Sequence, residues 1–238
     1  MPKKTYLTTR RAEDRSVRRP ELLARIQSFS TTFLLLGVTG GIATGKSTVA
    51  AMLGEMGART IDFDALARLV VEPGRPAYQD ILSFFGKQVL TADKDLDRKK
   101  LKEIVFQDRE KLRKLESFTH PRIWDEFLLQ IDSYSRETKP FILQVVAALL
   151  IETNMQSLFD HLLMVYLPEE VQLKRLIKRD GIGKDLAGEL VRSQMSVEEK
   201  KGYCDWVVDN SGPLEQTRQQ VQDIWRILAQ SLKVPDQA

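Results

Sequence analysis

Cysteine is almost absent from this sequence of 238 residues, since Cys204 is its only one. A lone cysteine cannot close an internal disulfide, and no CxxC or Cys/His cluster offers a zinc site. Long apolar runs are also missing, because the most apolar stretches, 33–38 and 141–151, fall well short of the roughly 20 residues that cross a bilayer. We therefore expect a soluble, cytoplasmic protein without a membrane partner.

The sequence also lacks a strong charge of one sign, because its formal net charge is only +3. Residues 1–31 carry eight Lys/Arg and three Asp/Glu, so the remaining residues sum to −2. A nucleic-acid-binding domain would carry its positive excess on the folded body, so we expect no nucleic-acid partner. Residues 1–31 have no apolar signal segment, and we interpret them as a poorly ordered extension. A weak role at an RNA or membrane surface is the alternative.

Short apolar segments alternate with amphipathic ones along the rest of the chain. The pattern predicts strands over 33–38, 58–61, 141–146, 162–167 and 206–208, and helices over 46–56, 169–179 and 214–232. Residues 77–137 read as amphipathic helices without a strand. Strands that are apolar throughout and alternate with helices indicate a parallel sheet covered on both faces. The sequence therefore predicts an α/β domain with a helical insertion.

A glycine-rich segment, GGIATGKS from Gly40 to Ser47, lies between the first predicted strand and the first predicted helix. It matches the P-loop pattern of Gly, four residues, Gly, Lys and Ser or Thr. Its glycines let backbone N–H groups turn toward phosphate oxygens, and the helix N-terminus adds the positive end of its dipole. Lys46 would reach the β- and γ-phosphates, and Ser47 would ligate Mg²⁺. The nucleotide contacts expected from this loop are Gly40, Gly41, Ile42, Ala43, Thr44, Gly45, Lys46, Ser47 and Thr48.

Two carboxylates, Asp62 and Asp64, follow the second predicted strand. Residues two apart in an extended chain point to the same side, and ligands bind at the carboxyl ends of parallel strands. We favour Asp64 as the base that accepts the proton of an attacking hydroxyl, and Asp62 as a partner of the metal. Alternatively, one of the two simply caps the helix expected from Ala65.

A basic helix face follows the fourth predicted strand. Gln172, Arg175 and Arg179 lie at spacings i, i+3 and i+7, and a glycine-containing segment, 180–183, comes next. Guanidinium groups brought in by a closing lid would stabilise the charge of a transferring phosphoryl group. A solvated helix face is the alternative.

Two further polar residues are open to either interpretation. A lone histidine such as His120, which precedes Pro121, is more often structural than catalytic. Glu152, which follows the third predicted strand, either contacts a substrate or starts a turn.

The ordered set of motifs resembles the dephospho-coenzyme A kinase family over roughly residues 34–212. Beyond the P-loop, the matching residues are Ile61-Asp-Phe-Asp64 with Ala67-Arg68, Val70 to Gly74, His120-Pro121, Leu149 to Glu152, Gln172, Arg175, Arg179-Asp180, Gln194, Asp209-Asn210 and Gly212. The sequence departs from the family pattern at Ala43-Thr44, Phe63, Ala148 and Cys204, where Gly-Ser, Ala, Pro and Ala are usual.

This resemblance implies a three-part body in a single domain over 32–234. The nucleotide-binding core would comprise 32–75, 139–168 and 203–234, the helical substrate domain 76–138, and the lid 169–202. It implies that ATP with Mg²⁺ phosphorylates the ribose 3′-hydroxyl of dephospho-CoA, the last step of CoA synthesis. The catalytic residues would then be Asp64, Lys46, Arg175 and Arg179, and the substrate contacts Thr39, Asp64, Arg68, His120 and Glu152.

Two other functions are compatible with parts of the sequence. A different nucleoside or nucleotide kinase of the P-loop class would share the core and the lid and differ in the helical substrate domain. A GTPase-like switch is suggested faintly by Ile177 to Asp180, but Ile stands where a guanine-reading motif requires Asn.

Overall fold

The computed structural model describes residue 26 and residues 33–106, 108–134, 137 and 139–232. The predicted extension over 1–31 lies outside these residues except for Ile26, which is buried and packs into the core of the domain.

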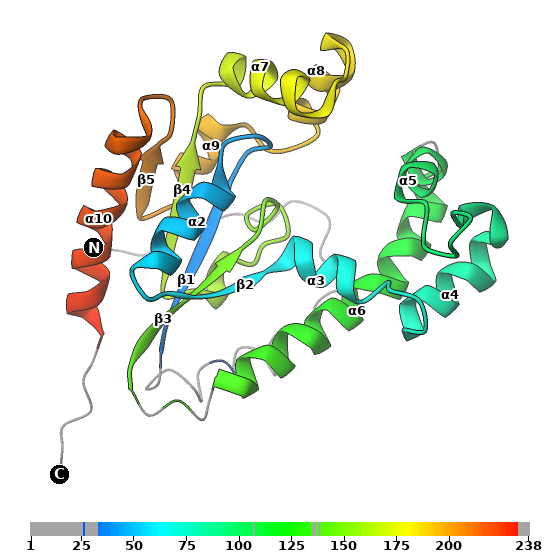
Figure 1. Cartoon of the computed structure of the whole chain (residues 1–238), viewed down its shortest axis with the longest axis horizontal. Coiled ribbons are helices and arrows are strands. Elements are labelled where there is room, and N and C mark those ends of the chain that lie inside the picture. Colours follow the sequence, from blue (N-terminus) through cyan, green and yellow to red (C-terminus); the bar gives the residue numbers. More distant parts are fainter. Residues whose placement is uncertain (1–25, 27–32, 107, 135–136, 138, 233–238) are drawn as a thin grey trace.

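Five parallel strands form one sheet in the order β2-β3-β1-β4-β5 (Figure 1). This confirms the predicted α/β fold class, and the bounds of the strands differ from the predicted ones by at most two residues. The central strand β1 pairs with β3 from Phe33 opposite Phe141 onward, and with β4 on its other side. The strands are β1 (Phe33–Gly40), β2 (Arg59–Asp62), β3 (Phe141–Val146), β4 (His161–Tyr166) and β5 (Trp206–Asp209).

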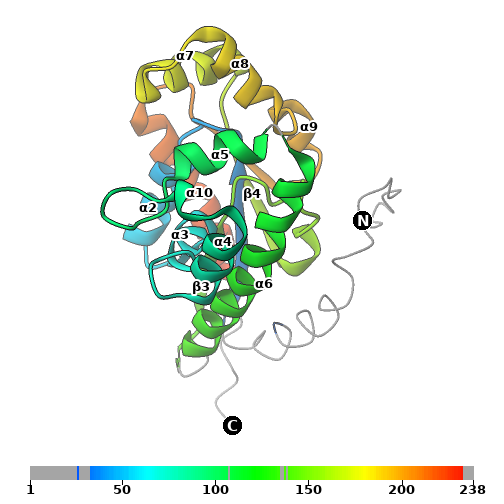
Figure 2. The ribbon, with the colours of Figure 1, turned by 90° about the vertical axis from the view of Figure 1, so that its right-hand side faces the viewer.

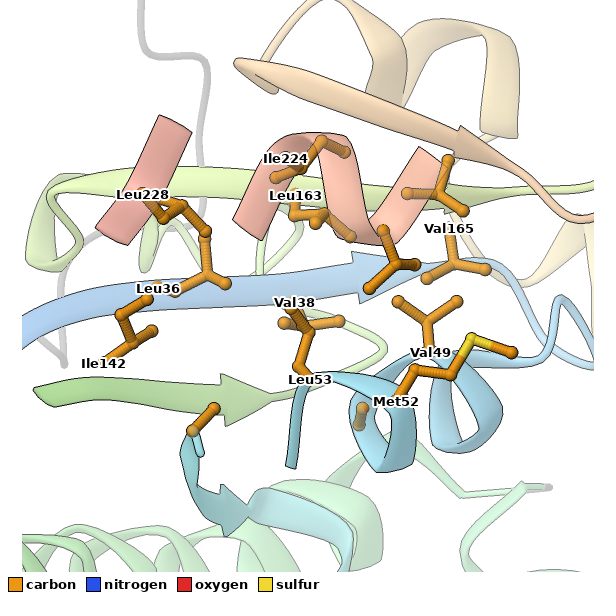
Figure 3. Close-up of a cluster of buried hydrophobic side chains, with 14 of the residues drawn as sticks. Leu36, Val38, Val49, Met52, Leu53, Ile142, Leu163, Val165, Ile224 and Leu228 are labelled. Atoms are coloured by element: carbon orange, nitrogen blue, oxygen red, sulfur yellow. The ribbon is translucent and has the colours of Figure 1, made fainter. Parts of the chain in front are cut away.

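Helices α2 (Lys46–Glu55) and α10 (Leu214–Ser231) cover one face of the sheet. Their apolar side chains meet alternate residues of β1, β3 and β4 (Figure 3). The other face of the sheet packs against α3 (Phe63–Leu69) and the second half of α6 (Arg109–Tyr134), whose Phe127 and Ile131 are fully buried. Alternate residues of β1 therefore belong to different cores, which explains why the whole strand is apolar.

The helical insertion has a small core of its own. It is built from α4 (Pro76–Phe85), the 3₁₀ turn η1 (Lys87–Val89), α5 (Arg98–Phe106) and the first half of α6. Figure 1 shows that α4 and α5 lie beside the sheet, joined to it along the length of α6. The insertion is therefore joined to the main domain through α6 and through the segment that follows α3.

Three helices follow β4 at the carboxyl end of the sheet (Figure 2). They are α7 (Glu169–Asp180), α8 (Lys184–Arg192) and α9 (Val197–Lys201), and a second 3₁₀ turn, η2 (Gln156–Leu158), precedes β4. The chain returns from α9 into the edge strand β5.

Within the part of the chain that the structure describes, every helix is too short or too polar to cross a membrane.

Candidate functional site: the phosphate loop and its cleft

The glycine-rich loop connects the central strand β1 to α2, the place that its sequence predicts. Gly45 has a φ of +92°, in the left-handed region that favours glycine. A Cβ atom at Gly45 would lie 2.2 Å from Nδ2 of Asn210, so a side chain there would displace the amide that closes the loop.

Three amide side chains from distant parts of the chain hold this loop, and we call Gln172, Gln194 and Asn210 the support residues. Asn210 donates from Nδ2 to the carbonyl of Thr44 at 2.8 Å, and Gln194 accepts the N–H of Ile42 at 2.9 Å. Gln172 is 2% exposed, and its Oε1 lies so close to Gly41 that a Cβ there would clash. The loop is therefore held by two hydrogen bonds, with Asn210 and Gln194, and by the close packing of Gln172.

Ala43 takes a left-handed conformation, with φ of +59°. The loop turns here as it would with glycine, the residue usual in the family at this position. A non-glycine residue pays a steric cost for this conformation. Alanine is thus held here in a conformation that glycine would adopt without this cost.

Lys46 is turned back onto its own loop. Its ammonium group donates to the carbonyls of Gly40 at 3.1 Å and Gly41 at 2.8 Å. Burial removes water from this ammonium group and the charge of Lys200 repels it, and together these effects lower the pKa of Lys46 to about 8. The charge of Asp64 acts in the opposite direction. The loop therefore holds a cation in a place where an anionic ligand would stabilise it.

The two predicted carboxylates have different local roles. Asp62 is the N-cap of α3, and its Oδ1 accepts the N–H groups of Asp64 at 2.8 Å and Ala65 at 3.3 Å. The capping alternative is thus confirmed for Asp62, and the helix begins at Phe63 instead of Ala65. Asp64, in the first turn of α3, is exposed and lines the cleft described below.

Arg175 and Arg179 both extend from α7 toward the loop. Arg175 donates to the backbone carbonyl of Asn210 at 3.0 Å. Arg179 forms two hydrogen bonds with the Asp180 carboxylate, at 2.6 and 2.9 Å, which raise the pKa of the Arg179 guanidinium. Both residues line the cleft described below, although Arg179 is also exposed to solvent.

A cleft of about 690 Å³ gathers most of the predicted chemical groups. It is bounded by the loop, the start of α2, the end of β2 and the inner side of α7. We call its five charged side chains the cleft residues: Lys46, Asp62, Asp64, Arg175 and Arg179. Ser47 lies in the same cleft with its side chain exposed.

Four predicted substrate contacts do not line this cleft. Thr39 is fully buried, and its hydroxyl donates to the carbonyl of Ala148 at 3.4 Å. Arg68 lies exposed on α3, and His120 lies half-buried within α6 beside Pro121. Glu152 forms an ion pair with Lys200, 2.8 Å away.

No local pattern in the sequence indicates a role for Gln194, Asn210 or Lys200. Gln194 and Asn210 stand out in the sequence only as part of a family resemblance. Lys200 gives no signal, because nothing in the sequence distinguishes it from the neighbouring Lys201, yet Lys200 is fully buried and Lys201 is not.

Two other departures from the family pattern have clear places in the structure. Phe63 points away from the cleft, and its ring packs against Trp124 and Phe127 of α6 at centroid distances of 5.5 and 5.1 Å. Cys204 packs against the core, where burial raises the pKa of its thiol to about 12. Neither residue obstructs the cleft.

The described residues contain no group of three or more His, Cys, Asp or Glu side chains that could hold a metal ion by themselves. Mg²⁺ in phosphoryl-transfer sites typically takes one or two carboxylates and fills its shell with water and substrate phosphates. The hydroxyl of Ser47 and the carboxylates of Asp62 and Asp64 in one cleft fit that requirement.

Comparison with known proteins gives a consistent result. The family model described as dephospho-CoA kinase (CoaE) matches residues 34–216. A dephospho-CoA kinase of Carboxydothermus hydrogenoformans is 46% identical over 187 residues, which cover 79% of this chain and 90% of that protein. The crystal structure of a Thermus thermophilus protein, TT1252, has a TM-score of 0.70 and 29% identity, and the match covers 84% of this chain and 98% of that one. The dephospho-CoA kinase of Campylobacter jejuni has a TM-score of 0.56 and 30% identity, with 82% and 97% covered.

Proposed function

This chain belongs to the dephospho-CoA kinase family, and we propose that it transfers the terminal phosphoryl group of ATP to the ribose 3′-hydroxyl of dephospho-CoA. The products are CoA and ADP, in the last step of coenzyme A biosynthesis. The observation that carries the proposal is the cleft, in which Lys46, Asp64 and Arg175 from three separate elements line one space at the carboxyl end of the sheet.

The loop and α7 would bind ATP. The backbone N–H groups of the loop and the N-terminus of α2 attract phosphate oxygens. Lys46 would exchange the carbonyls of Gly40 and Gly41 for the β- and γ-phosphates, which favour its charged form. Arg175 and Arg179 would neutralise charge on the transferring group. Arg179 would have to leave Asp180 to do so, and this exchange would accompany closure of the lid over 169–202.

Asp64 would act as the general base. Its carboxylate is exposed to the cleft, and it would orient the acceptor hydroxyl and take its proton as the oxygen attacks the γ-phosphorus. Asp62 holds the start of α3 and thereby fixes the backbone that carries Asp64.

Ser47 and Asp62 would hold Mg²⁺. Bound there, Mg²⁺ would neutralise charge that develops on the β- and γ-phosphate oxygens.

The helical insertion over 76–138 would contribute to the acceptor site. Arg68 and His120 lie on the elements that join the insertion to the main domain, and Thr39 and Glu152 lie at the carboxyl ends of β1 and β3. Arg68, His120 and Glu152 are the proposed contacts with the part of the acceptor that extends beyond the cleft shared by Lys46 and Asp64. Thr39 is fully buried, so the structure does not expose it to an acceptor.

The test is an ADP-release assay with ATP and Mg²⁺ that compares dephospho-CoA with nucleosides, nucleotides and pantetheine compounds. Among these acceptors, we expect turnover only with dephospho-CoA. In the Lys46→Ala variant, the rate of turnover should fall by a factor on the order of 10²–10³. A loss of this size is typical when one group that stabilises transition-state charge is removed. Lys139→Ala, an exposed lysine just before β3 at the opposite end of the sheet, is the matched control and should retain turnover. Equal turnover with another acceptor would overturn the assignment.

A further inference from the structure

A buried lysine outside the cleft holds one of the proposed acceptor contacts. We propose that Lys200 is a positioning residue of the acceptor site, which fixes the Glu152 carboxylate so that one of its oxygens accepts a hydrogen bond from a hydroxyl or N–H group of the bound dephospho-CoA. This inference rests on the proposed function and adds to it a residue that no motif identifies.

Both ends of the contact are tightly held. The ammonium group of Lys200, at the end of α9, lies 2.8 Å from Oε1 of Glu152 and donates to the carbonyl of Ala148 at 2.9 Å. The same Oε1 also accepts the backbone N–H of Met195 at 3.0 Å. Two donors from the α8–α9 region therefore fix one oxygen of the carboxylate and, with it, the orientation of the other.

The other oxygen of Glu152 is where a ligand can bind. Oε2 is buried and has no hydrogen-bond partner among the residues that the structure describes. The Glu152 side chain as a whole is 21% exposed, while that of Lys200 is 0% exposed. A buried carboxylate oxygen without a donor is unfavourable, and it is normally satisfied by a ligand or a water molecule. Glu152 is thus an acceptor that lacks one donor: its Oε2 is buried, on a side chain whose other atoms are partly exposed.

The location ties this pair to the reaction. Glu152 and Ala148 follow β3 at the carboxyl end of the sheet, where β1 enters the phosphate loop. The carbonyl of Ala148 also accepts the hydroxyl of Thr39, the residue that precedes the loop. The charges of Lys200 and Glu152 both act on the pKa of Lys46, so the pair lies within electrostatic reach of the nucleotide site.

A purely structural role does not require two buried charges at this place. Removing an ion pair from water is costly, and replacing such a pair by apolar residues of similar volume often leaves a fold as stable or more stable. Retaining a charge that ends in an unpaired oxygen therefore indicates a ligand that uses it.

The experiment measures the KM for dephospho-CoA, the KM for ATP and the midpoint of thermal unfolding for wild type, Lys200→Met, Glu152→Gln and the double variant. Lys201→Met is the matched control, because Lys201 is the next residue and pairs on the surface with Glu198. We expect Lys200→Met and Glu152→Gln each to raise the KM for dephospho-CoA at least tenfold and the KM for ATP less than threefold. Lys201→Met should change neither.

The double variant separates positioning from folding. Removing both charges should restore the unfolding midpoint that Lys200→Met lowers, because no unpaired charge remains buried, while the KM for dephospho-CoA stays raised. If the double variant recovers both the unfolding midpoint and the wild-type KM for dephospho-CoA, the role of the pair is structural and the inference is overturned. An equal rise in the KM for dephospho-CoA and the KM for ATP would also overturn it. If wild type turns over dephospho-CoA, and calorimetry shows that Glu152→Gln binds dephospho-CoA with wild-type affinity, the inference fails while the proposed function stands. Failure of wild type to turn over dephospho-CoA would overturn both.

Discussion

The cleft residues and the support residues surround one loop and differ in almost every physical respect. The five cleft residues are charged, and three of them, Asp62, Asp64 and Arg179, are exposed. The three support residues are neutral amides, and Gln172 and Asn210 are buried with their amide groups bonded to backbone. Charged groups that meet a ligand are mostly accessible, with Lys46 and Arg175 half-buried, whereas groups that hold a backbone can be fully buried because each donor finds a fixed acceptor.

This difference predicts a separation of effects. Changes in the cleft residues should alter turnover with little effect on stability, and changes in the support residues should alter stability and nucleotide affinity together.

The largest effect is expected for Asp64→Asn, which keeps the shape of the side chain and removes the base. Turnover should fall by roughly 10²–10⁴, the usual contribution of general acid–base catalysis. ATP binding, measured by calorimetry, and the midpoint of thermal unfolding should remain close to wild type. Turnover of this variant at the wild-type rate would remove Asp64 from the role of base.

Asn210→Ala tests the other side of the comparison. It leaves the Thr44 carbonyl and the Thr217 hydroxyl, both buried, without their partners. The free energy of unfolding in urea should fall by about 1–3 kcal/mol, the cost of leaving buried polar groups unsatisfied. The KM for ATP should rise at the same time. Gln219→Ala, an exposed amide on α10, is the control, and equal stability of the two variants would contradict the separation.

Asp62 is an exception to this division, because it is a cleft residue that also caps a helix. Asp62→Ala should lower the free energy of unfolding by about 0.5–2 kcal/mol. Asp62→Asn keeps an oxygen that can accept from the Asp64 and Ala65 N–H groups and should retain that stability. If Asp62 also serves the metal, Asp62→Asn should still require a higher Mg²⁺ concentration for half-maximal turnover. If Asp62→Asn requires the same Mg²⁺ concentration as wild type, Asp62 caps the helix and does not serve the metal.

The smallest effect is expected at Ala43, within the loop itself. Ala43→Gly removes the steric cost of a φ of +59° but gives the unfolded chain more freedom, so stability should rise by no more than about 1 kcal/mol. Ala43→Val, with a branched Cβ, should be destabilised in the same urea titration. A loss of stability in the glycine variant would show that the loop tolerates alanine without strain.

The fold and the cleft follow from local patterns in the sequence. Continuous apolar runs predict the strands, and because the carboxyl ends of parallel strands share one edge, the sequence alone is enough to place Lys46 and Asp64 together. The predicted start of α3 is two residues too late, because the pattern alone does not show whether Asp62 or Asp64 caps the helix.

Other parts of the site could not be predicted because they depend on tertiary packing. Lys200 and Lys201 are adjacent and chemically identical, and only the packing of α9 on the sheet decides which of them is buried. Likewise, no local pattern shows that the Asn210 amide closes a loop whose last glycine is Gly45, far earlier in the chain.

That separation along the chain has a consequence for how the protein is made. Strand β1 is synthesised early, but its partner β3 follows roughly 100 residues later, and at about 5–20 residues per second the ribosome needs several seconds to supply it. The insertion helices, whose contacts are more local, emerge in the interval and can fold first. Asn210 emerges later still, so a nascent chain carries the complete glycine motif long before it contains the amide that closes the loop.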